Sequence, residues 1–152
     1  MSELQVGSKA PEIKLLDDAG NPFQLSALKG KTVVLYFYPK ADTPGCTTES
    51  CEFRDADSKI LKKGAVVVGI SPDTPKAQEK FKTKFSLPFT LLADAEHATA
   101  EDYGVWKEKS MYGRKYMGIE RTTFIIGPDG KIAKIFNKVK PAGHADEVLA
   151  SL

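Results

Sequence analysis

Two runs of the chain are apolar on both sides of an extended strand, and they constrain the fold more than any other feature. Residues 32–38 read Thr-Val-Val-Leu-Tyr-Phe-Tyr, and residues 65–70 read Ala-Val-Val-Val-Gly-Ile. Such β-branched and aromatic runs are typical of strands in the middle of a sheet that is covered on both faces. Between them, residues 47–63 follow a helical spacing that Gly64 ends. The sequence therefore predicts a strand–helix–strand unit around a buried sheet.

The rest of the chain adds short strands and helices to this unit. Turn residues 17–22 separate two strand-like stretches, which predicts an N-terminal hairpin followed by a short turn over residues 26–28. Further predicted elements are a helix from Pro75 to about residue 85, a strand at 90–92, a helix at 95–103, a hairpin of 122–126 and 131–136, and a closing helix at 141–151. Residues 104–118 show no clear pattern. This order is that of an α/β protein with a mixed central sheet flanked by helices, and it resembles a thioredoxin-like fold with an N-terminal β-hairpin extension. Residues 1–152 are expected to form a single domain.

Composition and charge argue against several classes of protein. The 22 Lys+Arg and 20 Asp+Glu residues leave a formal charge of +2, and the lysines are scattered. Nucleic-acid and anionic-membrane surfaces need clustered cationic charge. No apolar run approaches the roughly 20 residues of a membrane helix, and residues 1–6 lack the features of a secretion signal. We therefore expect a cytoplasmic protein that binds neither nucleic acid nor membranes, with a removed organellar presequence as the alternative.

The chain has only two cysteines, Cys46 and Cys51, and they lie five residues apart just after the first buried strand. Cys46 falls at the start of the predicted helix, where exposed backbone amides and the positive end of the helix dipole stabilise an anion. The thiolate is the reactive form of cysteine. In a reducing compartment, a lone cysteine pair is more often catalytic or metal-binding than structural. The pair therefore indicates redox catalysis, with a partly buried structural cysteine as the plainer interpretation.

Neither a metal nor an organic cofactor is indicated. A zinc site needs four ligands, and His97 and His144 lie far apart without the spacing of paired ligands. Both histidines are expected in surface helices and receive no role. No glycine-rich phosphate loop follows any predicted strand, so the sequence implies no nucleotide or flavin. It does not imply a haem either.

The residues around Cys46 resemble the active site of a known family. The spacing Pro39-x-x-x-Thr43-x-x-Cys46 matches the pattern of the peroxiredoxins, which are thiol peroxidases of thioredoxin-like fold. The longer run Phe37-Tyr38-Pro39-Lys40-Ala41-Asp42-Thr43-Pro44-Gly45-Cys46-Thr47-x-Glu49, followed by Cys51, is similar to the bacterioferritin comigratory (Q-type) subfamily. The similarity extends from residues 7–11 through residues 118–124, which is nearly the whole chain.

This resemblance implies a role for each residue of the pattern. Cys46 is the peroxidatic nucleophile, which attacks the O–O bond of a hydroperoxide and becomes a sulfenic acid. Thr43 orients the peroxide, and Pro39 limits the access of water. Arg121 holds the thiolate and stabilises charge on the oxygens. Glu49, one helical turn after Cys46, helps to fix Arg121.

The sequence supports the position of Arg121 independently. If the strand at 122–126 runs antiparallel to the strand at 33–38, its first end lies beside Cys46. A planar and permanently charged guanidinium suits such a site better than a lysine. The alternatives are a surface arginine beside a strand and, for Glu49, a first-turn acid that interacts only with the helix dipole.

Cys51 is expected to resolve the sulfenic acid. Two helical positions five apart are separated by roughly 8–9 Å between Cα atoms, whereas a disulfide needs about 4.4–6.8 Å. The hypothesis is that residues 46–51 melt, that a Cys46–Cys51 disulfide forms, and that thioredoxin or a similar dithiol protein reduces it. The connector, residues 47–50, has weak-to-middling helix propensity, which favours melting. A structural role for Cys51 is the alternative.

Two other functions remain open from the sequence. A thioredoxin-type disulfide exchanger usually carries Cys-x-x-Cys, whereas four residues intervene here. A redox sensor that oxidises once and then binds a partner could have a nearly identical sequence. Tyr38, Phe85 and Trp106 are expected as apolar walls of the site or simply as core residues. By the resemblance, the substrates are hydrogen peroxide and organic hydroperoxides, and the protein is a monomer.

Overall fold

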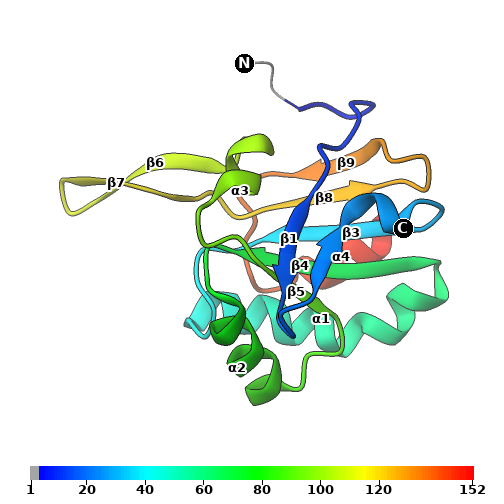
Figure 1. The fold of residues 1–152 in the computed structure, drawn as a ribbon, viewed down its shortest axis with the longest axis horizontal. Coiled ribbons are helices and arrows are strands. Elements are labelled where there is room, and N and C mark those ends of the chain that lie inside the picture. Colours follow the sequence, from blue (N-terminus) through cyan, green and yellow to red (C-terminus); the bar gives the residue numbers. More distant parts are fainter. Residues whose placement is uncertain (1–3) are drawn as a thin grey trace.

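A seven-stranded mixed sheet organises the protein, as seen in the computed structural model, which describes residues 4–152. The strands lie in the order β2-β1-β5-β4-β3-β8-β9, and β6 and β7 form a separate two-stranded sheet that extends away from the body (Figure 1). The strands are β1 (Lys14–Asp17), β2 (Pro22–Gln24), β3 (Thr32–Phe37), β4 (Ala65–Ser71), β5 (Thr90–Ala93), β6 (Trp106–Met111), β7 (Arg114–Ile119), β8 (Thr122–Ile126) and β9 (Ile132–Phe136). The helices are the 3-10 turn η1 (Leu25–Leu28), α1 (Pro44–Lys62), α2 (Pro75–Phe85), α3 (Ala98–Asp102) and α4 (His144–Ser151).

The register of β3 brings three chain segments to one edge of the sheet. β3 runs parallel to β4, with Phe37 opposite Ile70, and antiparallel to β8, with Phe37 opposite Thr122. The carboxyl ends of β3 and β4 and the beginning of β8 therefore meet. This edge is where α/β folds usually place their functional sites.

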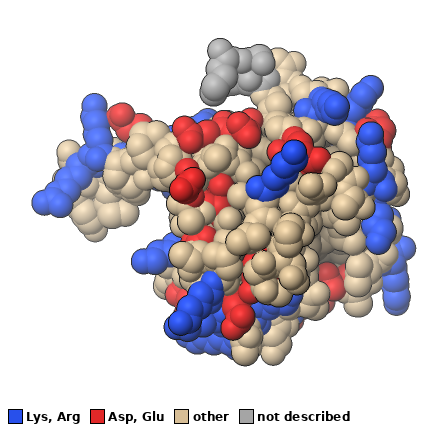
Figure 2. Space-filling view, in the orientation of Figure 1, with Lys and Arg blue, Asp and Glu red and all other residues tan. Residues whose placement is uncertain are grey.

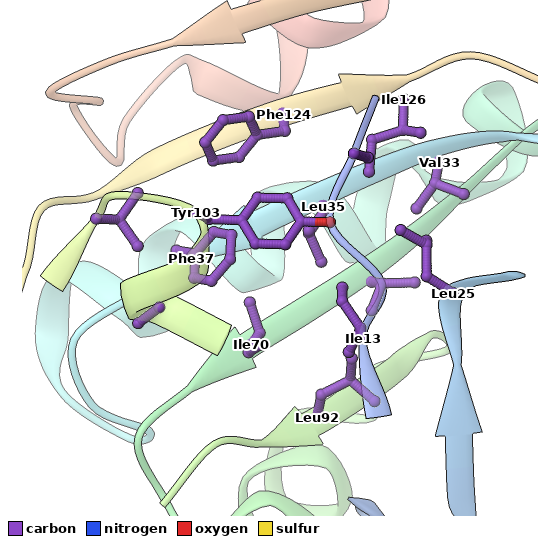
Figure 3. Close-up of a cluster of buried hydrophobic side chains, with 14 of the residues drawn as sticks. Ile13, Leu25, Val33, Leu35, Phe37, Ile70, Leu92, Tyr103, Phe124 and Ile126 are labelled. Atoms are coloured by element: carbon purple, nitrogen blue, oxygen red, sulfur yellow. The ribbon is translucent and has the colours of Figure 1, made fainter. Parts of the chain in front are cut away.

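The sheet separates two clusters of buried side chains. Alternate residues of β3 point to opposite faces, as the pleat requires. On one face, Val33, Leu35 and Phe37 pack against the N-terminal segment, α3 and the following loop, and we call this set the α3-side cluster (Figure 3). On the other face, Val34 and Tyr36 pack under α1, α2 and α4, and we call this set the α1-side cluster.

A glycine at the centre of the sheet makes room for an aromatic ring. A Cβ atom on Gly69 would lie 2.8 Å from Leu91 Cδ2 and 2.9 Å from the Tyr36 hydroxyl oxygen. Tyr36 can therefore lie across β4 and reach α1, where its hydroxyl oxygen is 2.8 Å from Ser50 Oγ.

Most of the elements predicted from the sequence are confirmed. The thioredoxin-like arrangement, the N-terminal hairpin at the edge of the sheet and the antiparallel pairing of β8 with β3 are all present. Four predictions were wrong or incomplete. The closing helix, α4, begins at His144 rather than at residue 141, because Gly143 has a left-handed backbone at the N-cap. Helix α1 begins at Pro44 rather than at residue 47, because Thr43 has the extended backbone of a helix N-cap. Helix α3 begins only at residue 98, because His97 has a left-handed backbone and Asp94 accepts hydrogen bonds from the amides of residues 99 and 100. Residues 104–118, which showed no pattern, contain β6 and most of β7.

Charged side chains of both signs are interspersed on the face drawn in Figure 2. Among the described residues, no helix is long and apolar enough to cross a membrane. The expectation of a cytoplasmic protein used the composition of residues 1–6, and residues 1–3 of this stretch lie outside the described residues.

Candidate active site

Cys46 lies in the first turn of α1, next to amides that no helical bond uses. Pro44 occupies the first helical position, where its missing N–H and fixed φ suit the start of a helix. The first amide bonded in the helical pattern belongs to Thr47, which donates to the carbonyl of Thr43 at 2.8 Å. The amides of Gly45 and Cys46 precede it and point out of the helix end. The Cys46 side chain is only 1 % exposed and packs in the α1-side cluster.

Arg121 reaches Cys46 from the start of β8. Its Nη2 atom donates to Cys46 Sγ at 3.3 Å, and its Nη1 atom donates to Glu49 Oε1 at 2.7 Å. Burial lowers the pKa of Arg121, but Glu49 and Cys46 outweigh burial, so that its pKa is raised above the usual value. The guanidinium is therefore a fixed positive charge that bridges the sulfur atom of Cys46 and the carboxyl group of Glu49.

Glu49 is completely buried beneath this guanidinium. Burial raises the pKa of Glu49 to about 7, although Arg121 acts in the opposite direction. Its second oxygen, Oε2, has no hydrogen-bond partner among the described residues. A buried carboxylate that is bonded on one side only is costly, so burial favours the neutral form of Glu49 and Arg121 opposes this by favouring the charged form. Glu49 and Cys46 are three residues apart on one helix face, and the structure brings both to Arg121 as predicted.

Thr43 and Pro39 belong to the loop that joins β3 to α1. The Thr43 hydroxyl does not cap the helix but donates to the carbonyl of Lys40 at 2.8 Å. Because this hydroxyl already donates its proton, its free lone pairs can accept a hydrogen bond from another molecule. Pro39 directly follows Tyr38 and is half-buried.

Cys51 lies in the second turn of α1 and is separate from Cys46. Both cysteines are free, and Cys51 is half-buried. Since α1 is continuous from Pro44 to Lys62, the helical spacing keeps their Cα atoms roughly 8–9 Å apart. The expected disulfide therefore cannot form while this part of α1 stays helical.

The three aromatic residues expected around the site divide between the two faces of the sheet. Tyr38 and Phe85 lie with Cys46 in the α1-side cluster. Trp106 packs on the opposite face and stacks on His97 with ring centroids 3.9 Å apart, so it is not a wall of this site.

The surface position expected for His144 was wrong. This residue is 2 % exposed, and its Nε2 atom is 2.7 Å from the Thr123 hydroxyl.

Sequence reasoning missed a set of polar side chains beside the loop. Gln78 is fully buried, and Ser71 is 1 % exposed. The two are hydrogen-bonded to each other, and Ser71 also bonds Asp73, which accepts from the amide of Ala41. A signal was available: Ser71 ends β4, the strand next to β3, and Asp73 lies in the turn after it, while Gln78 shares a helical face with Phe81 and Phe85. Among the described residues, no group of three or more His, Cys, Asp or Glu side chains could hold a metal ion.

Known proteins resemble the chain over almost its whole length. A match to the AhpC/TSA family covers residues 6–135. Peroxiredoxin Bcp of Bacillus subtilis (strain 168) is 49 % identical over 98 % of this chain and 95 % of its own length. Peroxiredoxin Bcp of Escherichia coli (strain K12) is 44 % identical over 98 % and 96 %.

Solved structures show the same similarity in three dimensions. A mutant of Xylella fastidiosa PrxQ superimposes with a TM-score of 0.93 at 35 % identity, covering 99 % of this chain and 96 % of that one. The bacterioferritin comigratory protein of Xanthomonas campestris, studied for its alkyl peroxide reduction activity, superimposes with a TM-score of 0.89 at 39 % identity, covering 97 % and 94 %.

Proposed function

Since the chain belongs to the AhpC/TSA family and, within it, to the Bcp or Q-type peroxiredoxins, which are thiol-dependent peroxidases, we propose that Cys46 is the residue that attacks the peroxide. The observation that carries this proposal is the contact of 3.3 Å between Arg121 Nη2 and Cys46 Sγ at the beginning of α1. A sulfur atom so placed faces a guanidinium and free helix amides, and both favour the thiolate.

In the first step, the Cys46 thiolate attacks the OH oxygen of a hydroperoxide. An S–O bond forms, the O–O bond breaks, and the leaving alkoxide or hydroxide takes up a proton to become an alcohol or water. Cys46 becomes a sulfenic acid. Negative charge moves from the sulfur to the departing oxygen, so a guanidinium beside both atoms stabilises the transition state throughout.

Thr43 would orient the substrate for this step. Its hydroxyl donates to the carbonyl of Lys40, and it can therefore accept a hydrogen bond from the O–H of the peroxide. Pro39, which has no N–H, would close the adjacent side of the site against water. Glu49 would hold Arg121 in place through the bond to Nη1. Hydrogen peroxide and organic hydroperoxides are the proposed substrates.

In the second step, Cys51 condenses with the sulfenic acid and water leaves. The residues between the two cysteines must first unwind. Oxidation favours this change, because a neutral sulfenic acid no longer pairs with Arg121 as a thiolate does, and the first turn of α1 loses an anchor. The resulting disulfide would be reduced by thioredoxin or a similar dithiol protein, which regenerates both thiols. The cytoplasmic location and the monomeric state are part of this proposal.

A peroxidase assay with a dithiol reductant tests the proposal. Wild type should turn over many times, and Cys46→Ser should show no activity above the background of the assay. Cys51→Ser should consume one equivalent of peroxide and then stall or depend on a small external thiol. If Cys46→Ser stays active, the attacking residue lies elsewhere. If wild type oxidises only once, the protein is a sensor rather than an enzyme.

Mass spectrometry of the peroxide-treated protein tests the resolving step. A Cys46–Cys51 disulfide lowers the mass by about 2 Da, corresponding to two hydrogens, and is absent from Cys51→Ser. In that variant, the sulfenic acid of Cys46 should instead react with dimedone. A disulfide-linked dimer of wild type would show that Cys51 does not resolve within the same chain.

A further inference from the structure

A chain of hydrogen bonds closes the loop that carries Thr43. Tyr38, at the beginning of the loop, donates from its hydroxyl to Gln78 Oε1 at 2.6 Å. Gln78 Nε2 donates to Ser71 Oγ at 2.8 Å, and Ser71 Oγ donates to Asp73 Oδ2 at 2.6 Å. The same Oδ2 atom accepts from the amide of Ala41 at 2.8 Å. The chain of bonds thus leaves the loop at residue 38, passes through α2 and the end of β4, and returns to the loop at residue 41.

The direction of every bond in this chain is fixed. The amide of Ala41 can only donate, so the oxygen of Asp73 accepts. The Ser71 proton is directed to that same oxygen, so Ser71 accepts from Gln78. The second N–H of the Gln78 amide donates to the carbonyl of Leu92 at 2.7 Å. Burial raises the pKa of Tyr38 well above its usual value, so its hydroxyl remains a donor.

The loop needs such support because its backbone is strained. Asp42 has a φ of 59°, in the left-handed region that residues other than glycine rarely adopt. It lies directly between Ala41, which Asp73 holds, and Thr43, whose hydroxyl bonds back to Lys40. Besides Asp73, Lys84 contacts this turn through an exposed ion pair with Asp42, and such pairs contribute little.

We propose that Asp73 is a positioning residue for the peroxidase reaction: by holding the amide of Ala41 it fixes the loop that carries the Thr43 hydroxyl and leads into the first turn of α1. Asp73 does not touch the substrate and acts through the backbone. The sulfur itself is held by other elements, α1 and Arg121, which the chain of bonds does not include. Loss of Asp73 therefore separates the orientation of the peroxide from the reactivity of the thiolate. This proposal rests on the proposed function.

The geometry provides a rescue variant. Both bonds to Asp73 end on the single atom Oδ2, so Asp73→Asn can retain both with its amide oxygen, whereas Asp73→Ala loses both. A buried donor that is left without a partner destabilises the arrangement that buries it. Lys84→Ala is the matched control, since it removes the exposed contact to the same loop.

The test compares two reactions of Cys46 in each folded variant: the rate with hydrogen peroxide and the rate of alkylation by iodoacetamide, which needs the thiolate but no oriented peroxide. Asp73→Ala should slow the peroxide reaction by about 10-fold to 100-fold and change alkylation by less than about twofold. Asp73→Asn and Lys84→Ala should stay close to wild type in both. If Asp73→Ala does not fold, Asp73→Ser replaces it, since its shorter side chain ends well before the amide of Ala41.

Three results would overturn the proposal. The first is an Asp73→Ala variant as fast as wild type with peroxide, and the second is an equal loss in both reactions, which indicates general disruption of the site. The third is an Asp73→Asn variant as slow as the alanine variant, which would assign the effect to charge instead of loop position. A wild-type protein inert to peroxide would overturn the proposed function and this proposal with it, whereas an active wild type isolates the role of Asp73.

Discussion

The two faces of the sheet bury similar apolar side chains but use their buried polar atoms differently. On the α3 side, these atoms serve the backbone: Asp94 caps α3 through the amides of residues 99 and 100, and the Tyr103 hydroxyl donates to the carbonyl of Pro11 at 2.6 Å. On the α1 side, the buried polar side chains also form hydrogen bonds with one another. The bonded sets there are Tyr36–Ser50, Tyr38–Gln78–Ser71, Thr123–His144 and Glu49–Arg121.

This difference indicates which face is arranged for chemistry. Capping bonds stabilise a helix wherever it lies, and they tolerate exchange of the side chains around them. Networks between buried side chains fix the position of each member, but they are costly when one partner is missing. The α1 side contains Cys46, and its networks hold α1, the loop at residues 38–43 and Arg121 in one arrangement. We therefore expect substitutions on the α3 side to change stability alone, and those on the α1 side to change reactivity as well.

The largest expected effect compares one phenylalanine from each cluster. Phe124 is 2 % exposed and packs edge-on to Phe37 and Tyr103, while Phe53 is 0 % exposed and stacks on Tyr36. Each change to alanine should lower the free energy of unfolding by about 3–5 kcal/mol, measured by urea denaturation. Only Phe53→Ala should also slow the reaction of folded protein with peroxide, because Phe53 supports α1. An equal loss of rate in Phe124→Ala would break the comparison.

The next effect concerns Arg121. Arg121→Gln removes the donor to Cys46 and should lower the rate with hydrogen peroxide by about 10²-fold to 10³-fold, as loss of a single transition-state donor does in other enzymes. Rapid-quench kinetics measure this rate. Arg121→Lys is the control, because it keeps a positive charge but cannot bond Cys46 and Glu49 together, so it should fall between wild type and the glutamine variant. A glutamine variant with the wild-type rate would remove Arg121 from the mechanism.

Replacing Glu49 is expected to have a smaller effect on the free energy of unfolding, and this effect should depend on pH. Because burial raises its pKa to about 7 from 4.5, the folded protein binds more protons than the unfolded chain between these values, and wild type loses stability as the pH rises through this window. Glu49→Gln has no such loss. The difference in the free energy of unfolding, variant minus wild type, should therefore rise between pH 5 and pH 7 and then level off. The total rise should be at most about 3 kcal/mol.

Urea denaturation of both proteins at several pH values provides the measurement. Burial lowers the pKa of His144, which on its own makes the protein less stable as the pH falls below the usual histidine value. Both proteins carry this residue, so its contribution cancels in the difference. A difference that does not change with pH would show that Glu49 titrates as an exposed carboxyl group.

The smallest expected effect tests how tightly the site is packed. A Cβ atom on Gly45 would lie 3.3 Å from Arg121 Nη2 and 3.4 Å from Pro141 Cγ. Gly45→Ala should improve the helix propensity of α1 but displace the guanidinium by a few tenths of an ångström. We expect little change in the free energy of unfolding and a peroxide rate lower by about fivefold, consistent with a cost of about 1 kcal/mol. A rate equal to that of wild type would show that Arg121 has room to move.

The sequence predicted the parts of the fold that depend on local pattern. The continuous apolar runs of β3 and β4 and the Gly-Pro-Asp-Gly turn before β9 are strong signals, and the pairing of β8 with β3 placed Arg121 beside Cys46. The hairpin of β6 and β7 gave no signal because its strands are largely exposed and contribute few buried side chains to an alternating pattern.

What the sequence could not supply were contacts between side chains distant along the chain. The sequence around His144 looks like that of a surface helix, but the side chain is buried next to Thr123 of β8, to which it is hydrogen-bonded. Likewise, the modest helix propensity of residues 47–50 understates the cost of unwinding them, since Glu49 and Ser50 are completely buried and bonded to Arg121 and Tyr36. Propensity describes an isolated helix, whereas tertiary contacts determine this one.

The central claim is that the surroundings of Cys46 make its sulfur an unusually fast nucleophile toward peroxide. The second-order rate constant of the reduced protein with hydrogen peroxide, compared with that of free cysteine at the same pH, tests it most directly. We predict that the protein reacts faster by a factor of at least about 10³, in line with the contribution of fixed charges at a transition state. A rate constant no higher than that of free cysteine would contradict the account.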